Sequence, residues 1–303
     1  MDFLDHFIKL HQIEGDIQVL CRFQGDWHIQ NPQTEQPIGA FHIISKGQCC
    51  VKLEGKCHHL QAGDVIFLPY GTQHELASCP TLLAVNPDQL IPIQQSTLGG
   101  FTLCHHPQSH DFEMFCGHFH YRSAANHPIF ELPKWHLSSN NPSIFALLTL
   151  LQQESDNLLG NKSVINALSN VLFTYLIRDY LQHQPLQHGI LSLLQDKRLQ
   201  NAVKAMIEQP ETAWSMDLLA ERCAMSRSNF IRAFKEKSGV SAGQFLTELR
   251  LRKAEMLLNS SQLSVQQIAL AVGYQSEAHF SKLFKAYKHC SPSQYRAENK
   301  TLP

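Results

Sequence analysis

The side chains with the clearest chemistry lie near the C-terminus, in two copies of one motif that are 50 residues apart. The copies are Ser226-Arg-Ser-Asn-Phe-Ile-Arg-Ala-Phe-Lys235 and Ser276-Glu-Ala-His-Phe-Ser-Lys-Leu-Phe-Lys285. In each copy a serine can cap a helix, and two aromatic residues four positions apart share one helical face. The opposite face is polar and basic, which suits hydrogen bonding to base edges and phosphates.

Each copy offers candidates for contact with the major groove. A guanidinium such as that of Arg232 can donate two hydrogen bonds to guanine, and an exposed Ile231 fits a thymine methyl. Lys235, Lys285 and Lys288 are better placed for phosphates, which add affinity but little sequence information. The candidate DNA contacts are Arg227, Ser228, Asn229, Ile231, Arg232 and Lys235 in the first copy, and Glu277, Ala278, His279, Lys282 and Lys285 in the second.

The elements that must position these side chains are helices. Apolar spacing and capping serines after residue 191 predict helices at Arg198–Glu208, Met216–Cys223, from Ser226, and at Ser241–Leu258, Val265–Val272, Glu277–Lys288 and Pro292–Glu298. Each motif copy follows a short helix and a turn, so the segment predicts two helix-turn-helix elements. A helical bundle with a solvated basic face is the alternative, and the repetition with matching turns argues against it.

Charge is divided unevenly along the chain. Residues 195–303 hold 16 basic and 10 acidic residues, a net charge of +6, whereas residues 1–194 hold 9 and 16, a net charge of −7. A basic second half suits a module that approaches phosphates while the first half does something else.

The residue pattern of the first half is typical of a β domain. Short apolar runs broken by Gly, Pro, Asn and Asp predict a barrel or sandwich, with strands at Ala40–Ile44, Cys49–Leu53, Asp64–Leu68, Thr81–Val85 and Phe112–Tyr121.

Between the two halves, residues 142–156 and 162–181 have helical spacing of apolar residues, and their wide apolar faces favour either packing on the β domain or dimerisation. We therefore expect an α+β multidomain chain with a β-barrel over residues 1–135, a helical dimerisation segment over 136–190 and an all-α double helix-turn-helix over 191–303.

The C-terminal motifs resemble the AraC/XylS family of transcription regulators. The match covers about 100 residues, including Leu218–Phe234, Leu249-Arg-Leu-Arg-Lys-Ala, Ile268–Lys285 and Ser291-Pro-Ser-Gln-Tyr-Arg. The resemblance implies that one copy of this domain contacts two successive major-groove segments, with the helix Ser241–Leu258 setting the two recognition helices. It implies a regulator of activator type, with promoter DNA, RNA polymerase and a second copy of the chain as partners. Ala242 departs from the family, in which proline is common at this position.

The first half resembles the cupin β-barrels. Gly63-Asp-Val-Ile-Phe-Leu-Pro-Tyr-Gly-Thr-Gln-His74 is similar to their second motif, and Phe41-His-Ile-Ile-Ser-Lys-Gly47 to a reduced first motif. Cys116-Gly-His-Phe-His-Tyr121 and His127-Pro-Ile-Phe-Glu-Leu-Pro133 resemble the sensor domain of one AraC subfamily. The resemblance implies a domain that senses a small molecule, a metal or an oxidant.

Metal-binding cupins carry two histidines and a glutamate in the first motif and one histidine in the second, whereas this chain keeps only His42 and His74. Because an enzyme also needs an open metal position and acid–base groups, we predict that the chain is not an enzyme. Three alternatives remain for Cys21, His42, His74 and Cys116: a bound divalent metal such as zinc, thiol-based oxidant sensing, or a metal-free pocket. Strand alternation places His118 on the face of Cys116, so the candidate effector pocket comprises His42, His74 and His118.

The first residues lack a basic region followed by an apolar one, and no apolar run approaches the roughly 18–20 residues that span a bilayer. We therefore expect a cytoplasmic transcription regulator without a membrane partner, controlled by a signal in its cupin-like domain. A metal-dependent cupin enzyme fused to a DNA-binding domain, and a regulator whose barrel serves only for assembly, are the alternative hypotheses.

Overall fold

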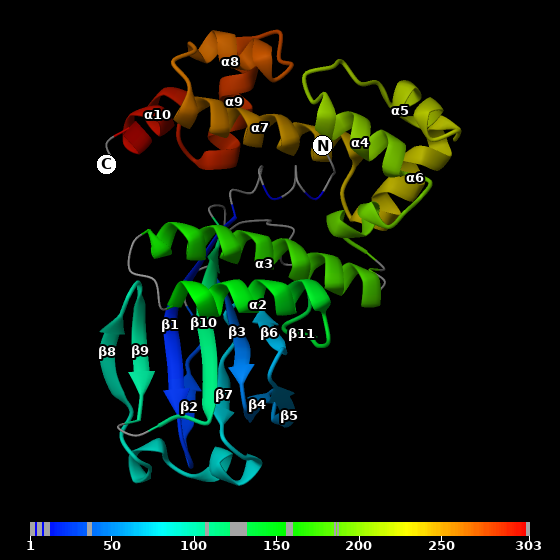
Figure 1. Cartoon of the computed structure of the whole chain (residues 1–303). Coiled ribbons are helices and arrows are strands. Elements are labelled where there is room, and N and C mark those ends of the chain that lie inside the picture. Colours follow the sequence, from blue (N-terminus) through cyan, green and yellow to red (C-terminus); the bar gives the residue numbers. More distant parts are fainter. Residues whose placement is uncertain are drawn as a thin grey trace. The chain divides into compact units, whose positions relative to one another are not determined.

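The computed structural model describes residues 4, 8, 13–34, 38–106, 109–121, 132–155, 160–184, 186 and 188–300 (Figure 1). The chain divides into two compact units, one spanning residues 12–184 and the other formed mainly by residues 185–303. None of the described helices is long and apolar enough to cross a bilayer. The segment 127–131, part of the expected cupin resemblance, lies outside the described residues.

The first unit is built on two sheets. The larger sheet has the strand order β11-β6-β3-β10-β1-β9-β8, and the smaller one has the order β2-β7-β4-β5. The larger sheet comprises β1 (Glu14–Phe23), β3 (Ile38–Lys46), β6 (Val65–Leu68), β8 (Gln94–Leu98), β9 (Phe101–His105), β10 (Phe112–His120) and β11 (His136–Ser138). The smaller sheet comprises β2 (His28–Asn31), β4 (Gln48–Leu53), β5 (Lys56–Gln61) and β7 (His74–Ala77).

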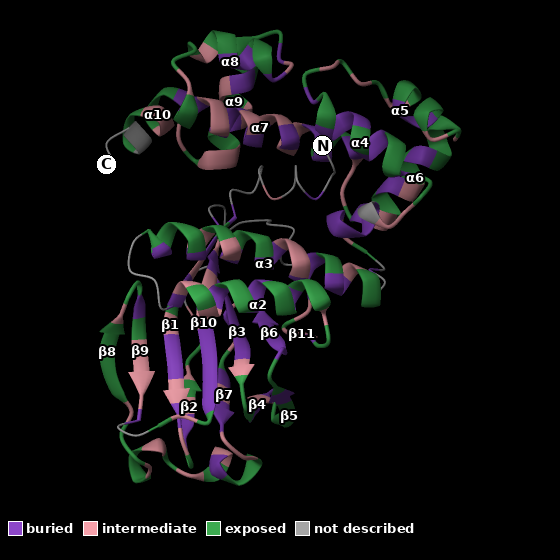
Figure 2. Ribbon diagram, viewed as in Figure 1, coloured by how far each residue is buried: buried purple, intermediate pink, exposed green. Residues whose placement is uncertain are grey.

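Strand alternation explains why one strand serves two cores. On β10, Met114 packs into the core between the sheets, whereas Phe119 packs on the opposite face against Phe173. The inter-sheet core contains residues from both sheets, among them Phe23, Ile44, Val51, Leu60 and Leu76. Because β10 packs on both of its faces, most of its residues are buried (Figure 2).

Two helices follow the strands, α2 (Pro142–Ser155) and α3 (Asn161–His183). Phe173 of α3 contacts Phe67 and Phe119 of the larger sheet, with ring centroids 6.2 and 4.9 Å apart. The helices expected as a separate segment over 136–190 thus belong to the same compact unit as the sheets. The physical reason is that the larger sheet has an apolar outer face, and α3 packs on that face and buries it.

One predicted strand is wrong. Thr81–Ala84 lies in a 3-10 helix, η1 (Pro80–Ala84), and Val85 follows it, because Pro80 occupies the first turn and cannot donate to a sheet ladder. A second 3-10 helix, η2 (Pro87–Gln89), follows it.

The second unit consists of helices. They are η4 (Ile190–Leu194), α4 (Gln200–Glu208), α5 (Met216–Arg222), α6 (Arg227–Ser238), α7 (Ala242–Ser260), α8 (Val265–Ala271), α9 (Glu277–Lys288) and α10 (Pro292–Lys300). The predicted capping serines are confirmed: Ser226 accepts a hydrogen bond from the amide of Asn229, and Ser276 from that of His279. The paired phenylalanines of α6 and α9 are fully buried and form the centres of two separate cores.

Candidate functional site

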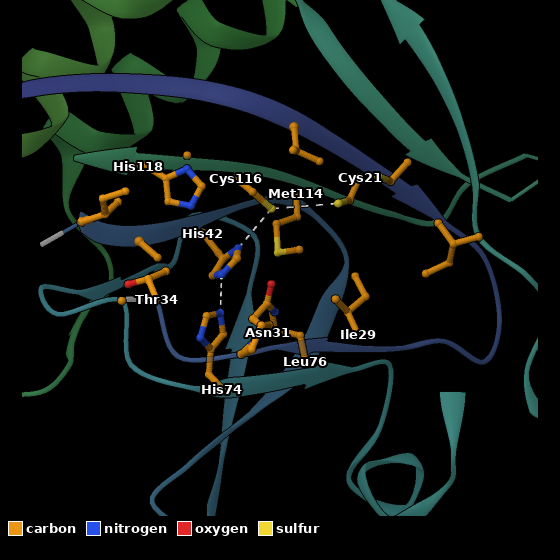
Figure 3. Close-up of a pocket in the computed structure, with 18 of the residues that line it drawn as sticks. Cys21, Ile29, Asn31, Thr34, His42, His74, Leu76, Met114, Cys116 and His118 are labelled. Carbon is orange, nitrogen blue, oxygen red and sulfur yellow. Dashed lines mark hydrogen bonds between the residues drawn. The ribbon is translucent and has the colours of Figure 1, made fainter. Parts of the chain in front are cut away.

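The two sheets of the first unit enclose a cavity of about 760 Å³. Most of its wall is apolar and comes from Val19, Phe23, Ile29, Ala40, Leu76, Ile93 and Met114. The thiols and imidazoles on the wall are Cys21, His42, His74, Cys116 and His118, which Figure 3 labels, together with Cys104. All five residues that the sequence proposed for a metal or effector site thus lie at one cavity.

A chain of hydrogen bonds runs along one side of this cavity. His42 Nδ1 lies 3.0 Å from Cys116 Sγ, and His42 Nε2 lies 2.7 Å from His74 Nε2. His74 Nδ1 lies 2.7 Å from the carbonyl oxygen of Thr72. Burial lowers the pKa of both imidazoles, that of His42 well below its usual range, so both rings are neutral near pH 7.

Because both imidazole rings are neutral, each has one donor and one acceptor nitrogen, and this fixes the direction of the hydrogen bonds. A carbonyl only accepts, so Nδ1 of His74 carries the proton and its Nε2 is an acceptor. His42 must then donate from Nε2, which leaves its Nδ1 free to accept from the thiol of Cys116. The thiol of Cys116 is therefore oriented by two histidines in series.

Three thiols meet on the neighbouring strands. Cys21 Sγ lies 4.0 Å from Cys116 Sγ, and Cys21 pairs with Cys104 in the parallel register of β1 and β9. The hydrogen bond with Cys104 lowers the pKa of Cys21, but the bond with Cys116 and burial together raise it well above its usual value. The pKa of Cys104 is also raised, first by its bond with Cys21 and then by burial. Both thiols are thus protonated at neutral pH.

These contacts do not present four ligands to one ion. His42 directs its two ring nitrogens to different partners, so Cys116 and His74 lie on opposite sides of its ring. Among the described residues, no group of three or more His, Cys, Asp or Glu has an arrangement that could hold a metal ion. The divalent metal stays a prediction, and it would require His42 to release one of its two partners.

The buried histidines make the stability of the first unit depend on pH. Because burial lowers the pKa of His42 and His74, the unfolded chain binds more protons than the folded one below its own histidine pKa of about 6.5. Stability is then full above that pH and decreases as pH falls through the lower folded values. We expect calorimetry to show this loss between about pH 7 and 5, and a smaller loss in the His42→Gln, His74→Gln double variant. An equal pH slope in the double variant would contradict this origin.

The candidate DNA contacts lie on α6 and α9, and all of them are exposed. On α6, Arg232 Nη2 lies 3.4 Å from Asn229 Oδ1, and Arg227 Nε lies 3.6 Å from Asp217 Oδ2. On α9, the ring of His279 meets Tyr274 edge-on. The burial of Phe230, Phe234, Phe280 and Phe284 on the inner sides turns the polar residues of both helices outward.

Lys288, which the sequence favours for a phosphate contact, forms an ion pair within the second unit. Its Nζ lies 2.6 Å from Glu255 Oε1, and the side chains of both residues are largely buried, at 13% and 9% exposure. The ammonium is therefore neutralised within the second unit, whereas Lys235 and Lys285 are exposed and have no such carboxylate partner among the described residues.

Some residues of the site escaped the sequence analysis. Cys104 reaches Cys21 only because β1 and β9 pair in parallel, and Thr72 acts through a backbone carbonyl that no side-chain pattern marks. The apolar wall supplied by Ile29 and Leu76 depends on the second sheet. Period-two spacing could have indicated Met114, two residues before Cys116.

Both units of the chain are similar to known protein families. A cupin family model matches residues 2–182, which include α2 and α3, and a helix-turn-helix domain model matches residues 219–298. The "Uncharacterized HTH-type transcriptional regulator" of Haemophilus influenzae is 43% identical over 98% of both chains. The HTH-type transcriptional regulator MtrA of Neisseria gonorrhoeae is 35% identical over 98% of this chain and 99% of that protein. The RCS-specific HTH-type transcriptional activator RclR of Escherichia coli is 26% identical over 100% of this chain and 99% of that protein.

These similarities extend over both units and agree with the cupin sheets and the two helix-turn-helix elements of the structure. The chain therefore belongs to the family of AraC-type helix-turn-helix transcription regulators that carry an N-terminal cupin domain.

Proposed function

We propose that this DNA-binding transcription regulator contacts promoter DNA through the outer faces of α6 and α9. The observation that carries the assignment is the exposure of every polar candidate on both helices above a pair of fully buried phenylalanines. Arg227, Ser228, Asn229, Ile231 and Arg232 would contact base edges from α6, and Glu277, Ala278, His279 and Lys282 from α9. Lys235 and Lys285 would contact phosphates.

The cavity of the first unit is the proposed sensor site, and its proposed effector is a small, largely apolar molecule. A volume of about 760 Å³ is in the range of small-molecule sites, and most of the wall is apolar. Cys116 and His42 are hydrogen-bonded to each other. His118 is a further polar group on the cavity wall, and it can orient an effector. Burial lowers the pKa of His118, so a neutral effector is favoured over an anion.

A filled-cavity variant tests this assignment. Ala40 lines the cavity and is buried, so Ala40→Phe places a ring in the space that an effector would occupy. With the neutral fluorophore N-phenyl-1-naphthylamine as probe, we expect wild-type protein to increase the fluorescence and Ala40→Phe to lose at least about tenfold in probe affinity. Ala84→Phe is the matched control, because Ala84 is exposed on η1 and does not line the cavity. Equal binding by both variants would exclude the cavity as the probe site.

A second signal, oxidation, is favoured by one observation, the 4.0 Å between the sulfurs of Cys21 and Cys116. Hydrogen peroxide would take two protons and two electrons from the two thiols and be reduced to two waters, or a hypohalous acid to halide, a proton and water. A disulfide of about 2.05 Å would form between the two sulfurs with modest movement. The relative RclR is named as an RCS-specific activator, which is compatible with such a signal. A mass loss of two hydrogens in peroxide-treated wild type, absent in Cys21→Ser, would support it; no mass loss would exclude it.

We also propose that the regulator is a homodimer that activates transcription through RNA polymerase. On α3 the residues Val164, Leu168, Val171 and Tyr175 follow each other at helical spacing and form a partly exposed face beside the buried Ile165 and Leu172. Val164 and Val171 are 42% and 41% exposed. We name these four residues the α3 stripe; a second copy of the chain is its proposed occupant, because an isologous contact of such stripes closes as a dimer. Activation is proposed from the name of RclR, which is called an activator.

A further inference from the structure

The two helix-turn-helix elements have separate cores that share one helix. The first core contains Leu249 of α7 together with residues of α4, α5 and α6, and the second contains Leu251 of α7 together with residues of α8 and α9. Among the described residues, no side chain belongs to both cores. Apolar packing therefore stabilises each element separately, and α7 contributes side chains to both cores.

Arg250 lies at the position where α7 passes from one core to the other. Its Nε donates to the carbonyl oxygen of Pro210 at 2.7 Å, and its Nη2 donates to that of Thr212 at 2.9 Å. Both carbonyls belong to the loop between α4 and α5 of the first element. The same guanidinium lies 5.5 Å from the ring centroid of Tyr274, in the turn between α8 and α9 of the second element. One planar group thus contacts both elements.

Two neighbouring contacts join the same loop to the second element. Lys253 Nζ lies 2.8 Å from Glu211 Oε2. The backbone of Glu211 approaches Gly273 so closely that a Cβ at residue 273 would lie 2.6 Å from its carbonyl oxygen. Gly273 also has a φ of +91°, so the position favours glycine for both reasons. The loop itself is stiffened by the hydrogen bond from Trp214 Nε1 to the carbonyl oxygen of Gln209 at 2.9 Å.

We propose that Arg250 is a positioning residue that clamps the two elements in one relative placement and so determines which spacing between two DNA segments the regulator accepts. The clamp comprises Arg250, the loop carbonyls of Pro210 and Thr212, Tyr274 and Gly273. A guanidinium that donates to two carbonyls of one element and lies over an aromatic ring of the other has a defined geometry, which fixes both elements relative to Arg250. Base contacts by α6 and α9 require both helices to meet their grooves together.

The test measures tolerance to spacing with full-length protein. A duplex is selected by the wild-type chain from a random library, and derivatives carry one or two inserted base pairs between the two segments that footprinting shows to be contacted. Wild type should lose on the order of tenfold in affinity on the inserted duplexes, because one helix loses its base contacts. Arg250→Met should bind the selected duplex more weakly and discriminate between spacings by no more than about threefold.

The control is a buried arginine on the same helix that does not touch the clamp. Arg252 donates to Glu248 Oε1 from Nε and Nη2, at 3.0 and 2.6 Å. Arg252→Met should keep the wild-type discrimination between spacings even where it lowers stability. Gly273→Ala is the second clamp variant, because its new Cβ must displace the backbone of Glu211; it should reduce or shift the spacing preference.

The proposal would be overturned if the Arg250→Met variant folded and still discriminated between spacings as the wild type does. If Arg250→Met does not fold, the same result with Gly273→Ala would overturn it. Failure of the wild-type chain to select any defined duplex would count instead against base recognition by α6 and α9. The two failures are therefore distinguishable.

Discussion

Arg232→Ala is expected to weaken binding to a specific DNA site by about 5-fold to 150-fold and to relax base preference at one position of that site. The side chain is exposed on α6, two residues after the buried Phe230, and its guanidinium lies 3.4 Å from the side-chain oxygen of Asn229. An arginine in the major groove donates two hydrogen bonds to guanine, and alanine leaves both acceptors unpaired. Competition binding against a library randomised at each position measures the change.

Two control variants distinguish the loss of a base contact from the loss of a positive charge. Arg198→Ala removes the same charge from an exposed arginine that pairs with Asp196 and lies outside both recognition helices. It should change affinity only slightly and leave base preference intact. Lys235→Ala should weaken all sequences alike and reduce the salt dependence of binding by about one unit of slope. If Arg232→Ala retained wild-type base preference, Arg232 would not be a base contact.

Val171→Glu is expected to raise the dissociation constant of the homodimer by on the order of a hundredfold or more. The residue lies in the middle of the α3 stripe, and a two-fold axis would bring it near its own copy. Two carboxylates would then face each other with partial loss of water, which costs several kcal/mol. Sedimentation equilibrium measures the change directly. Binding to a duplex with two sites should fall in parallel, because avidity is lost with the dimer.

Val164→Glu is the second variant of the stripe and should act in the same direction. Ile91→Glu is the matched control, since Ile91 is 56% exposed in the loop after η2 and lies outside the stripe. A wild-type dimer that persists in both stripe variants would place the dimer contact elsewhere. A wild-type chain that is monomeric at all concentrations would refute the homodimer.

Local patterns in the sequence were enough for much of the DNA-binding unit. Ser226 and Ser276 cap helices as predicted, because capping depends on a side chain and an amide only three residues away. The alternation on β10 likewise placed Cys116 and His118 on the same face, since the period of a strand is local. Thr81–Val85 failed because its apolar residues resemble a strand while Pro80 begins a 3-10 helix.

The sequence by itself determined the double helix-turn-helix, the β-rich first half, and the residue types of both candidate sites. It did so because periodicity, capping and charge are properties of neighbouring residues. Only the tertiary structure decided how those residues are used. It turned the two nitrogens of His42 towards different partners, joined Cys104 to Cys21 through a parallel pairing, withdrew Lys288 to Glu255 and placed Arg250 between two cores. Each of these depends on contacts between segments far apart in the chain, whose register and direction no local pattern specifies.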